Sequence, residues 1–394
     1  MRALAPAGMP RCAVPGRHAA PLTQRRSCAA GAPVRRSVSH FAAGAPTRRC
    51  AVHPRACLAN TAAPPFQLAY ELVQGAAVPP PPAPGVAARR APQPYTAVVL
   101  HGILGSRRNL ASFVRRMAAL HPSWQFLLVD LRCHGGSAAA AAPGPHTLAA
   151  AADDVLRLLA ALKLYPHALV GHSFGGKVAM AMVHQFGSRG PGAAAAPLAR
   201  PVLPRPVQVW VLDTVPGDVF ADGGDHPRDV ISFVQSLAMP LQSRKQLVDA
   251  LTGRGFTQAG AQWMTTNLVQ RSDGMLDWAF DISGIAQMYK SYEATDLWPL
   301  VEAPPQGALI DFVRAERSAF RWSGPDEERI TAAGARVHLL RDASHWVHSA
   351  FTLEAAYAPG GKPRFADAPL VSLAVDNPEG LAEILGPSLK RLQA

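Results

Sequence analysis

One segment of the chain combines a candidate nucleophile with the backbone turn that would expose it. Residues 171–175 read Gly-His-Ser-Phe-Gly and lie between an apolar strand-like stretch and an apolar helix-like stretch. This G-x-S-x-G pattern predicts a nucleophile elbow, in which Gly171 and Gly175 leave room for neighbouring backbone and Ser173 stands at the tip of a tight turn. In that case the chemistry is acyl transfer through the serine hydroxyl. The alternative is that Ser173 only caps the helix that follows.

Two further side chains follow later strands, in the chain order of a Ser, acid and His triad. Asp213 and His345 each come directly after a predicted apolar strand. We expect Ser173 to be the nucleophile, His345 the general base and then the general acid, and Asp213 the group that holds the imidazole tautomer. His348 is a competing base, but His345 is nearer to the strand end. Asp213 also has an alternative interpretation, because an Asp before a Val-Pro pair can simply form a turn.

Backbone N–H groups and flanking side chains complete the predicted site. The oxyanion of a tetrahedral intermediate is expected to accept hydrogen bonds from the N–H groups of Phe174, directly after the nucleophile, and Ile103, in a Gly-containing loop after an earlier strand. His101 and Trp346 are the predicted substrate contacts, and His101 is also suited to orient its own loop. Lys177, close behind the elbow, is expected on the helix surface or as a tether for a loop.

Alternating strands and helices would bring these groups to one edge of a sheet. Strands are predicted at Gln67–Val73, Thr96–Leu100, Trp124–Val129, His167–Val170, Val207–Leu212, Ala308–Val313 and Val337–Leu340. Helices are predicted at Asn109–Leu120, Thr147–Leu162 and Pro378–Leu392, with Asp153 and Asp154 on the outer face of the second. The short connections between them predict an α/β fold with a doubly wound, mostly parallel sheet.

A helical cap is predicted between two of these strands. Residues 218–300 show helical periodicity and no clear strand. We therefore expect an α/β core formed by 65–217 and 301–394, interrupted by the cap. Trp263 and Trp278 of the cap are suited to line an acyl pocket, although aromatic side chains at such positions more often belong to the core.

The positive charge is concentrated at the N-terminus. Residues 1–70 hold ten arginines and neither lysine nor acidic residues, so the rest of the chain has 29 basic and 27 acidic residues despite a formal charge of +12. This distribution argues against a nucleic-acid partner, which would require the charge on the folded body. An Arg- and Ala-rich, acid-free segment without an apolar run is typical of an organellar transit peptide, and we predict one at 1–60, for the chloroplast rather than the mitochondrion. The alternative is a basic tail without a targeting role.

Cysteine usage argues against disulfides in the mature chain. Cys12, Cys28, Cys50 and Cys57 lie in the predicted transit peptide, which leaves Cys133. We therefore expect no disulfide, no cysteine cluster for a metal, and no cofactor. No apolar run reaches the roughly 18 residues of a membrane span, and no phosphate-binding glycine motif is present.

Six ordered segments carry a resemblance to a known family. They are HGILGS at 101–106 with Asn109, DLRCHGGS at 130–137, GHSFGGK at 171–177, DTVP at 213–216, TTNL at 265–268 and SHWVH at 344–348. With these segments the chain resembles the α/β-hydrolase superfamily and, within it, the abhydrolase domain-containing 11 branch and its bacterial esterase relatives. The resemblance implies a serine hydrolase of small or medium acyl esters or thioesters, located in an organelle.

The resemblance also bears on the acid and on the reaction. Many superfamily members place the acid after the penultimate strand, where this chain has Ser318, whereas the branch points to Asp213, with Asp281 and Glu316 as alternatives. A hydrolase-fold binding protein with little turnover, and a C–C hydrolase or acyltransferase with the same triad, remain alternatives. Dehalogenase and epoxide hydrolase chemistry is disfavoured, because that resemblance would require Asp at the position of Ser173.

Overall fold

The computed structural model describes residues 67–79, 93–140, 142–187, 207–218, 225–318, 322–345 and 377–393. All of them belong to one unit of the chain, which spans 62–394. The predicted transit peptide at 1–60 lies outside the described residues, as do Trp346 and His348. None of the described helices has the length and apolar character needed to cross a membrane.

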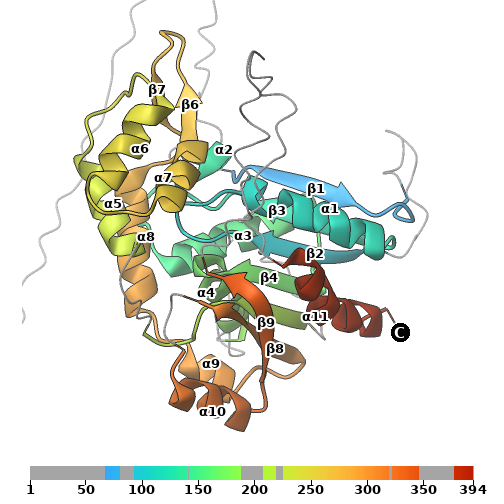
Figure 1. The fold of residues 1–394 in the computed structure, drawn as a ribbon. Helices are drawn as coiled ribbons and strands as arrows, with labels where there is room; N and C mark the ends of the chain where they lie inside the picture. Colours follow the sequence, from blue (N-terminus) through green and yellow to red (C-terminus); the bar gives the residue numbers. More distant parts are fainter. Residues whose placement is uncertain are drawn as a thin grey trace, which may run out of the picture. The chain divides into compact units, whose positions relative to one another are not determined.

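The described strands form one large sheet and one small one. The strands of the large sheet are β1 (Tyr70–Gln74), β2 (Tyr95–Leu100), β3 (Trp124–Val129), β4 (Ala168–His172), β5 (Val207–Leu212), β8 (Ala308–Arg317) and β9 (Arg336–Ser344). Their order across the sheet is β1-β3-β2-β4-β5-β8-β9 (Figure 1). Only β1 runs antiparallel to its neighbour, so the predicted mostly parallel sheet is confirmed.

Helices cover both faces of this sheet. They are α1 (Ala111–Leu120), α3 (Leu148–Leu162), α4 (Phe174–Gly187), α10 (Gly324–Ala332) and α11 (Pro378–Arg391), with the short η1 (Arg107–Leu110) and α2 (Gly135–Ala138) in loops. Successive residues of a strand point to opposite faces. In β3, Phe126 therefore packs in the core under α1 and α11, whereas Leu127 packs in the core under α3 and α4.

Helix α3 shows how local sequence sets an element, and where its prediction fails. The Thr147 side chain accepts a hydrogen bond from the N–H of Ala150 and caps the helix, which ends at Lys163 in the left-handed conformation. The expectation that Asp154 lies on the outer face is wrong. Asp154 is only 9% exposed and forms a buried ion pair with Arg132 at 2.7 Å.

The cap is inserted between β5 and β8 (Figure 1, yellow to orange). Its elements are α5 (Pro227–Ser236), α6 (Arg244–Thr252), α7 (Gln258–Met264), η2 (Thr265–Asn267), β6 (Leu268–Gln270), β7 (Leu276–Trp278) and α8 (Ile282–Ala294), and α9 (Trp298–Glu302) leads back to β8. The expectation of no strand here is wrong, because β6 and β7 pair antiparallel. Strands of three residues are too short to produce a recognisable alternating pattern. The apolar side chains of the cap are continuous with the core under α3 and α4.

Candidate active site

Ser173 stands at a sharp turn between β4 and α4. Its φ is 51°, in the left-handed backbone region that residues other than glycine rarely adopt. A Cβ at Gly171 would overlap the carbonyl oxygen of Gly175, and a Cβ at Gly175 would lie 2.6 Å from the carbonyl oxygen of His101. The turn is held against the next strand, because Ser173 N donates to Leu212 O at 2.8 Å. The backbone therefore fixes the position of the serine.

The imidazole of His345 is bound to the carboxylate of Asp213. The two residues follow β9 and β5, are each 4% exposed, and have their Nδ1 and Oδ2 atoms 2.7 Å apart. Since a carboxylate only accepts hydrogen bonds, Nδ1 is the nitrogen that carries the proton in the neutral form of the ring. Nε2 is then unprotonated and available to accept the proton of another group, which is the state that a general base requires.

Asp213 accepts three more hydrogen bonds. The donors are the Ala315 N–H at 3.0 Å, the Ser318 hydroxyl at 2.7 Å and Trp322 Nε1 at 3.1 Å. Burial by itself would raise the pKa of Asp213, but the hydrogen bond and charge of His345, together with the other donors, hold that pKa below its usual value. Ser318, which follows β8, thus donates to a carboxylate that follows β5.

The two alternative acids have other partners. Asp281 caps α8, where its Oδ1 accepts from the N–H groups of Ser283 and Gly284. Glu316 accepts from the N–H of Asp342 at 2.8 Å on the exposed side of β8 and β9. The structure thus brings Asp213 to His345 and gives both alternatives a structural role.

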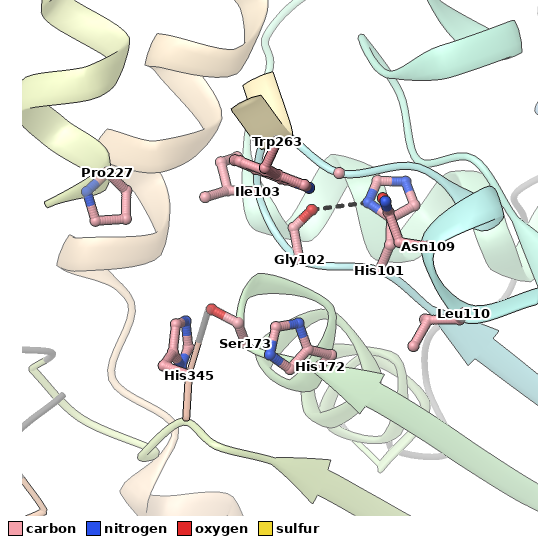
Figure 2. Close-up of a pocket in the computed structure, with 11 residues that line it drawn as sticks. His101, Gly102, Ile103, Asn109, Leu110, His172, Ser173, Pro227, Trp263 and His345 are labelled. Atoms are coloured by element: carbon pink, nitrogen blue, oxygen red, sulfur yellow. Dashed lines mark hydrogen bonds between the residues drawn. The ribbon is translucent and has the colours of Figure 1, made fainter. Parts of the chain in front are cut away.

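Ser173, His345 and residues of the loop after β2, namely His101, Gly102, Ile103 and Gly105, line one pocket (Figure 2). In Figure 2 the Ser173 hydroxyl points toward the His345 ring at the floor of the pocket. The pocket encloses about 400 Å³, part of it open to solvent. Its apolar walls are Ile103, Leu110, Pro227 and Trp263. Core and cap therefore both contribute walls, and apolar groups dominate the space next to the serine.

A second apolar cavity lies within the cap. It spans about 220 Å³, part of it open to solvent, and is lined in part by Val230, Leu251, Phe256 and Met264. Trp263 lines both cavities. Trp263 is therefore the residue that the linings of the two pockets have in common.

His101 orients the loop that carries Ile103. Its Nε2 accepts the N–H of Leu131 at 3.0 Å, so Nδ1 carries the proton and donates to Gly102 O at 2.8 Å. A trans peptide holds its C=O and N–H on opposite sides, so this bond turns the N–H of Ile103 away from His101. His101 is 1% exposed, and burial lowers its pKa to about 4, which keeps the ring neutral. The loop-orienting role expected for His101 agrees with these bonds, and because the residue also lines the pocket, its contact with substrate stays a prediction.

Phe174 supplies the second predicted oxyanion donor. It is the first residue of α4, and the first N–H groups of a helix have no acceptor within the helix. The positive end of the helix dipole is at the same place. The N–H of Phe174 therefore suits an anion next to Ser173.

Two other histidines stay neutral beside the site. The His172 ring packs against His345 with 5.1 Å between centroids. Burial, and next the charge of His345, lower the pKa of His172 to about 3. His134 accepts the N–H of Leu104 at 3.1 Å, and burial lowers its pKa to about 3 as well. Neither ring therefore adds a positive charge beside His345 at neutral pH.

Tyr292 reaches the site from α8 and was not predicted from the sequence. Its hydroxyl is 2.7 Å from Thr214 Oγ1, next to the acid. Burial raises the pKa of Tyr292, and hydrogen bonds with Thr214 and Ser173 oppose that rise. Only the cap fold brings position 292 to the elbow, and no short motif around this tyrosine signals it.

Lys177 is a fully buried tether between α4 and the cap. Its Nζ donates to Gly217 O at 2.7 Å, Tyr292 O at 2.9 Å and Thr295 O at 3.0 Å. Burial lowers its pKa to about 8, against the raising effect of nearby carboxylates. Of the two interpretations made from the sequence, the structure matches the loop tether.

A sequence model of the alpha/beta hydrolase family matches residues 97–355. The sn-1-specific diacylglycerol lipase ABHD11 of Mus musculus is 29% identical over 296 residues, which cover 72% of this chain and 81% of that protein. Its counterpart in Xenopus laevis is 27% identical over 293 residues, covering 72% and 79%. The resemblance to this branch is therefore confirmed.

A solved structure supports the same fold. A marine microorganism esterase matches with a TM-score of 0.51 and 19% identity, covering 72% of this chain and 94% of that one. At this identity the match concerns the fold alone. It agrees with the sheet order and the parallel strands described above.

Proposed function

The chain belongs to the alpha/beta hydrolase family, and from that premise we propose that it is a serine hydrolase cleaving acyl esters or thioesters through Ser173, His345 and Asp213. The observation that carries the proposal is the 2.7 Å contact of His345 Nδ1 with Asp213 Oδ2, at the floor of the pocket that Ser173 lines. That contact leaves Nε2 as a base for the serine hydroxyl.

In the first half-reaction Ser173 is acylated. His345 Nε2 takes the proton as Ser173 Oγ attacks the acyl carbon, and the N–H groups of Ile103 and Phe174 bind the oxyanion. The imidazolium is stabilised by Asp213, and it then protonates the departing alcohol or thiol. Loss of one such oxyanion donor typically costs about 10² to 10³ in rate.

In the second half-reaction water cleaves the acyl-enzyme. His345 Nε2 removes a proton from water, the hydroxide attacks the acyl carbon, and the same N–H groups bind the second oxyanion. Its collapse releases the carboxylic acid and returns the proton to Ser173 Oγ. No group outside the chain is needed apart from substrate and water.

The pocket supports small or medium acyl groups. Its walls next to Ser173 are apolar, and it shares Trp263 with the second cavity in the cap. Because the two vertebrate relatives are named as sn-1-specific diacylglycerol lipases, diacylglycerols belong among the esters to be tested. An apolar wall binds acyl chains with about 0.8 kcal/mol per buried methylene.

The proposal is tested with p-nitrophenyl esters from acetate to palmitate and with a diacylglycerol, comparing the wild type with Ser173→Ala. We expect turnover that Ser173→Ala abolishes, with an optimum at short or medium chains. A folded wild-type protein that hydrolyses none of them would contradict the proposal and favour a binding protein with the same fold. A C–C hydrolase or an acyltransferase would react with a fluorophosphonate probe at Ser173 but would not hydrolyse the esters.

We also propose that residues 1–60 direct the chain to the chloroplast. This rests on the arginines and the lack of acidic residues in that segment. A fluorescent fusion of residues 1–60 should accumulate in chloroplasts of a plant or algal cell. Accumulation in mitochondria or in the cytosol would contradict the assignment.

A further inference from the structure

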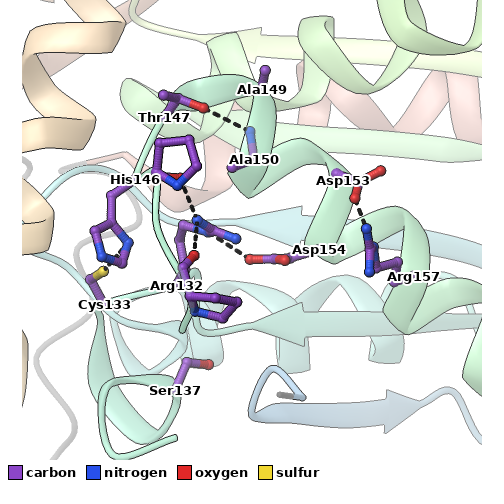
Figure 3. Close-up of polar contacts among 12 residues, drawn as sticks. Arg132, Cys133, Ser137, His146, Thr147, Ala149, Ala150, Asp153, Asp154 and Arg157 are labelled. Atoms are coloured by element: carbon purple, nitrogen blue, oxygen red, sulfur yellow. Dashed lines mark hydrogen bonds and ion pairs between the residues drawn. The ribbon is translucent and has the colours of Figure 1, made fainter. Parts of the chain in front are cut away.

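Three side chains that are distant in the sequence meet outside the active site. Cys133 follows β3, His146 precedes α3, and Asp281 is the N-cap of α8. Each offers one ligand atom, and the three atoms lie within 4.8 Å of one another. Cys133 Sγ and His146 Nδ1 are 3.3 Å apart, and Figure 3 shows the His146 ring facing the Cys133 side chain.

A buried ion pair holds two of these ligands in place. Arg132, next to Cys133, pairs with Asp154 of α3 at 2.7 Å (Figure 3). Its Nη1 also donates to Pro143 O at 3.3 Å and to Pro145 O at 2.9 Å. Both carbonyls belong to the loop that ends at His146. The guanidinium therefore fixes that loop alongside the backbone of Cys133.

The third ligand is oriented by the start of α8. Asp281 Oδ1 accepts the N–H groups of Ser283 at 3.0 Å and Gly284 at 3.1 Å. The backbone is also paired here, because Asp281 N donates to Cys133 O at 2.8 Å. A Cβ at Gly284 would overlap Cys133 Sγ and lie 2.7 Å from Asp281 Oδ2. The missing side chain of Gly284 thus leaves Cys133 Sγ and Asp281 Oδ2 facing the same space.

We propose that Cys133, His146 and Asp281 bind a divalent transition-metal ion of the Zn²⁺ type. Sulfur, imidazole nitrogen and carboxylate oxygen are the ligands that Zn²⁺ takes in proteins. Ligand atoms bound at about 2.0–2.3 Å in a tetrahedron are separated by about 3.5 Å. The 3.3 Å between Sγ and Nδ1 is close to that value. His146 is partly exposed and Asp281 is exposed, so a water molecule can complete the coordination from outside.

The charges and protons of binding balance. The thiol of Cys133 loses its proton to solvent, and the thiolate and the Asp281 carboxylate together neutralise the two charges of the ion. His146 binds as the neutral imidazole. Binding therefore weakens at low pH.

The site would cross-link the core to the cap. Cys133 and His146 belong to loops of the core, whereas Asp281 begins α8, the helix that carries Tyr292 to the neighbourhood of Ser173. A metal bound there would restrain the start of α8 and raise the thermal stability of the chain. The reaction of Ser173 would not require it.

Cobalt spectroscopy tests the proposal independently of hydrolysis. The parent protein is the full chain with Cys12, Cys28, Cys50 and Cys57 changed to Ser, so that Cys133 is the remaining thiol. Titration with Co²⁺ should produce a thiolate-to-cobalt charge-transfer absorption that saturates at one ion per chain. Competition with Zn²⁺ then gives the zinc affinity, and Zn²⁺ should raise the thermal midpoint of this parent.

Variants at the other ligands decide whether a built site exists. His146→Gln and Asp281→Asn should each weaken Co²⁺ binding at least about tenfold. Asn caps a helix as well as Asp, so Asp281→Asn keeps α8 intact while removing the anionic ligand. His184→Gln, at an exposed histidine of α4, is the matched control and should bind like the parent.

Cys133→Ser should abolish the absorption. The proposal is overturned if the folded parent shows no thiolate-to-cobalt band. It is equally overturned if His146→Gln and Asp281→Asn both bind with the affinity of the parent, because the ion would then be held by an isolated thiol. The variants at His146, which is partly exposed, and at Asp281, which is exposed, decide the matter even if Cys133→Ser fails to fold.

Discussion

Replacing Asp213 by Asn gives a sharp test of the acid assignment. Oδ2 accepts from His345 and from the rotatable Ser318 hydroxyl, whereas Oδ1 accepts from the Ala315 N–H and from Trp322 Nε1. If the new NH₂ group replaced Oδ1, it would face two donors that cannot become acceptors. It is therefore expected at the position of Oδ2, where it must donate to His345 Nδ1.

That orientation puts His345 in the wrong tautomer. The ring proton moves to Nε2, and Nε2 can then no longer accept the proton of Ser173. Loss of the tautomer costs about 10⁴ in turnover in a serine protease triad, which corresponds to about 5 kcal/mol of barrier. We expect a similar loss of kcat here, while the fold is retained because the Ser318 hydroxyl can reorient to accept.

Two matched carboxylate-to-amide changes are the controls. Asp281→Asn alters the carboxylate that caps α8, and Glu316→Gln alters the carboxylate that accepts the N–H of Asp342. Each should leave kcat on the preferred p-nitrophenyl ester within about twofold, since neither touches the reacting atoms. Circular dichroism and the thermal midpoint establish folding. Near-wild-type turnover by a folded Asp213→Asn protein, or a collapse of turnover in either control, would refute the reasoning.

Three further predictions concern stability and specificity. The first concerns three buried histidines whose pKa values lie below the 6.5 of the unfolded chain, at about 4 for His101 and about 3 for His134 and His172. Their contribution to the free energy of unfolding is therefore complete above pH 6.5 and is lost as the pH falls toward 4. The free energy of unfolding, measured by urea denaturation, should therefore drop between pH 7 and pH 5, by up to about 1.4 kcal/mol per pH unit for each group. A free energy of unfolding that stays constant over this range would contradict this. Trp263→Ala should join the two cavities and shift the preferred acyl chain of the ester to a greater length, with about 0.8 kcal/mol of binding free energy gained per added methylene. If the chain length with the highest kcat/KM stays the same, the indole does not limit the length of the acyl chain. Lys177→Met should lower the free energy of unfolding by about 1–3 kcal/mol, because three backbone carbonyls lose their donor. A urea midpoint of the variant equal to or higher than that of the wild type would argue against the tether.

Features with a local signal were predictable from the sequence. The strands of the sheet are apolar runs, and the Gly spacing around Ser173 is a steric requirement of the turn. Asp213 and His345 could be placed near Ser173 because parallel strands end at the same edge of a sheet. The structure brings these three residues together as that reasoning expects.

Features that depend on long-range packing were not predictable. Asp154 has the periodicity of an outer-face residue, but its partner Arg132 lies in a loop 22 positions earlier. Lys177 could be read as a surface residue or a tether, and only the return of α8 to the elbow settles its partners. In the same way, the meeting of Cys133 with Asp281 depends on how the cap packs on the core.

Covalent labelling of Ser173 tests the central claim most directly. Full-length wild-type protein and Ser173→Ala are incubated with a fluorophosphonate probe, and the modified peptide is identified by mass spectrometry, with p-nitrophenyl butyrate hydrolysis measured in parallel. We predict one label per chain, on Ser173, and loss of both label and hydrolysis in Ser173→Ala. Wild-type protein that is folded but neither labels nor hydrolyses, or hydrolysis that survives Ser173→Ala, would contradict a serine hydrolase built on this elbow.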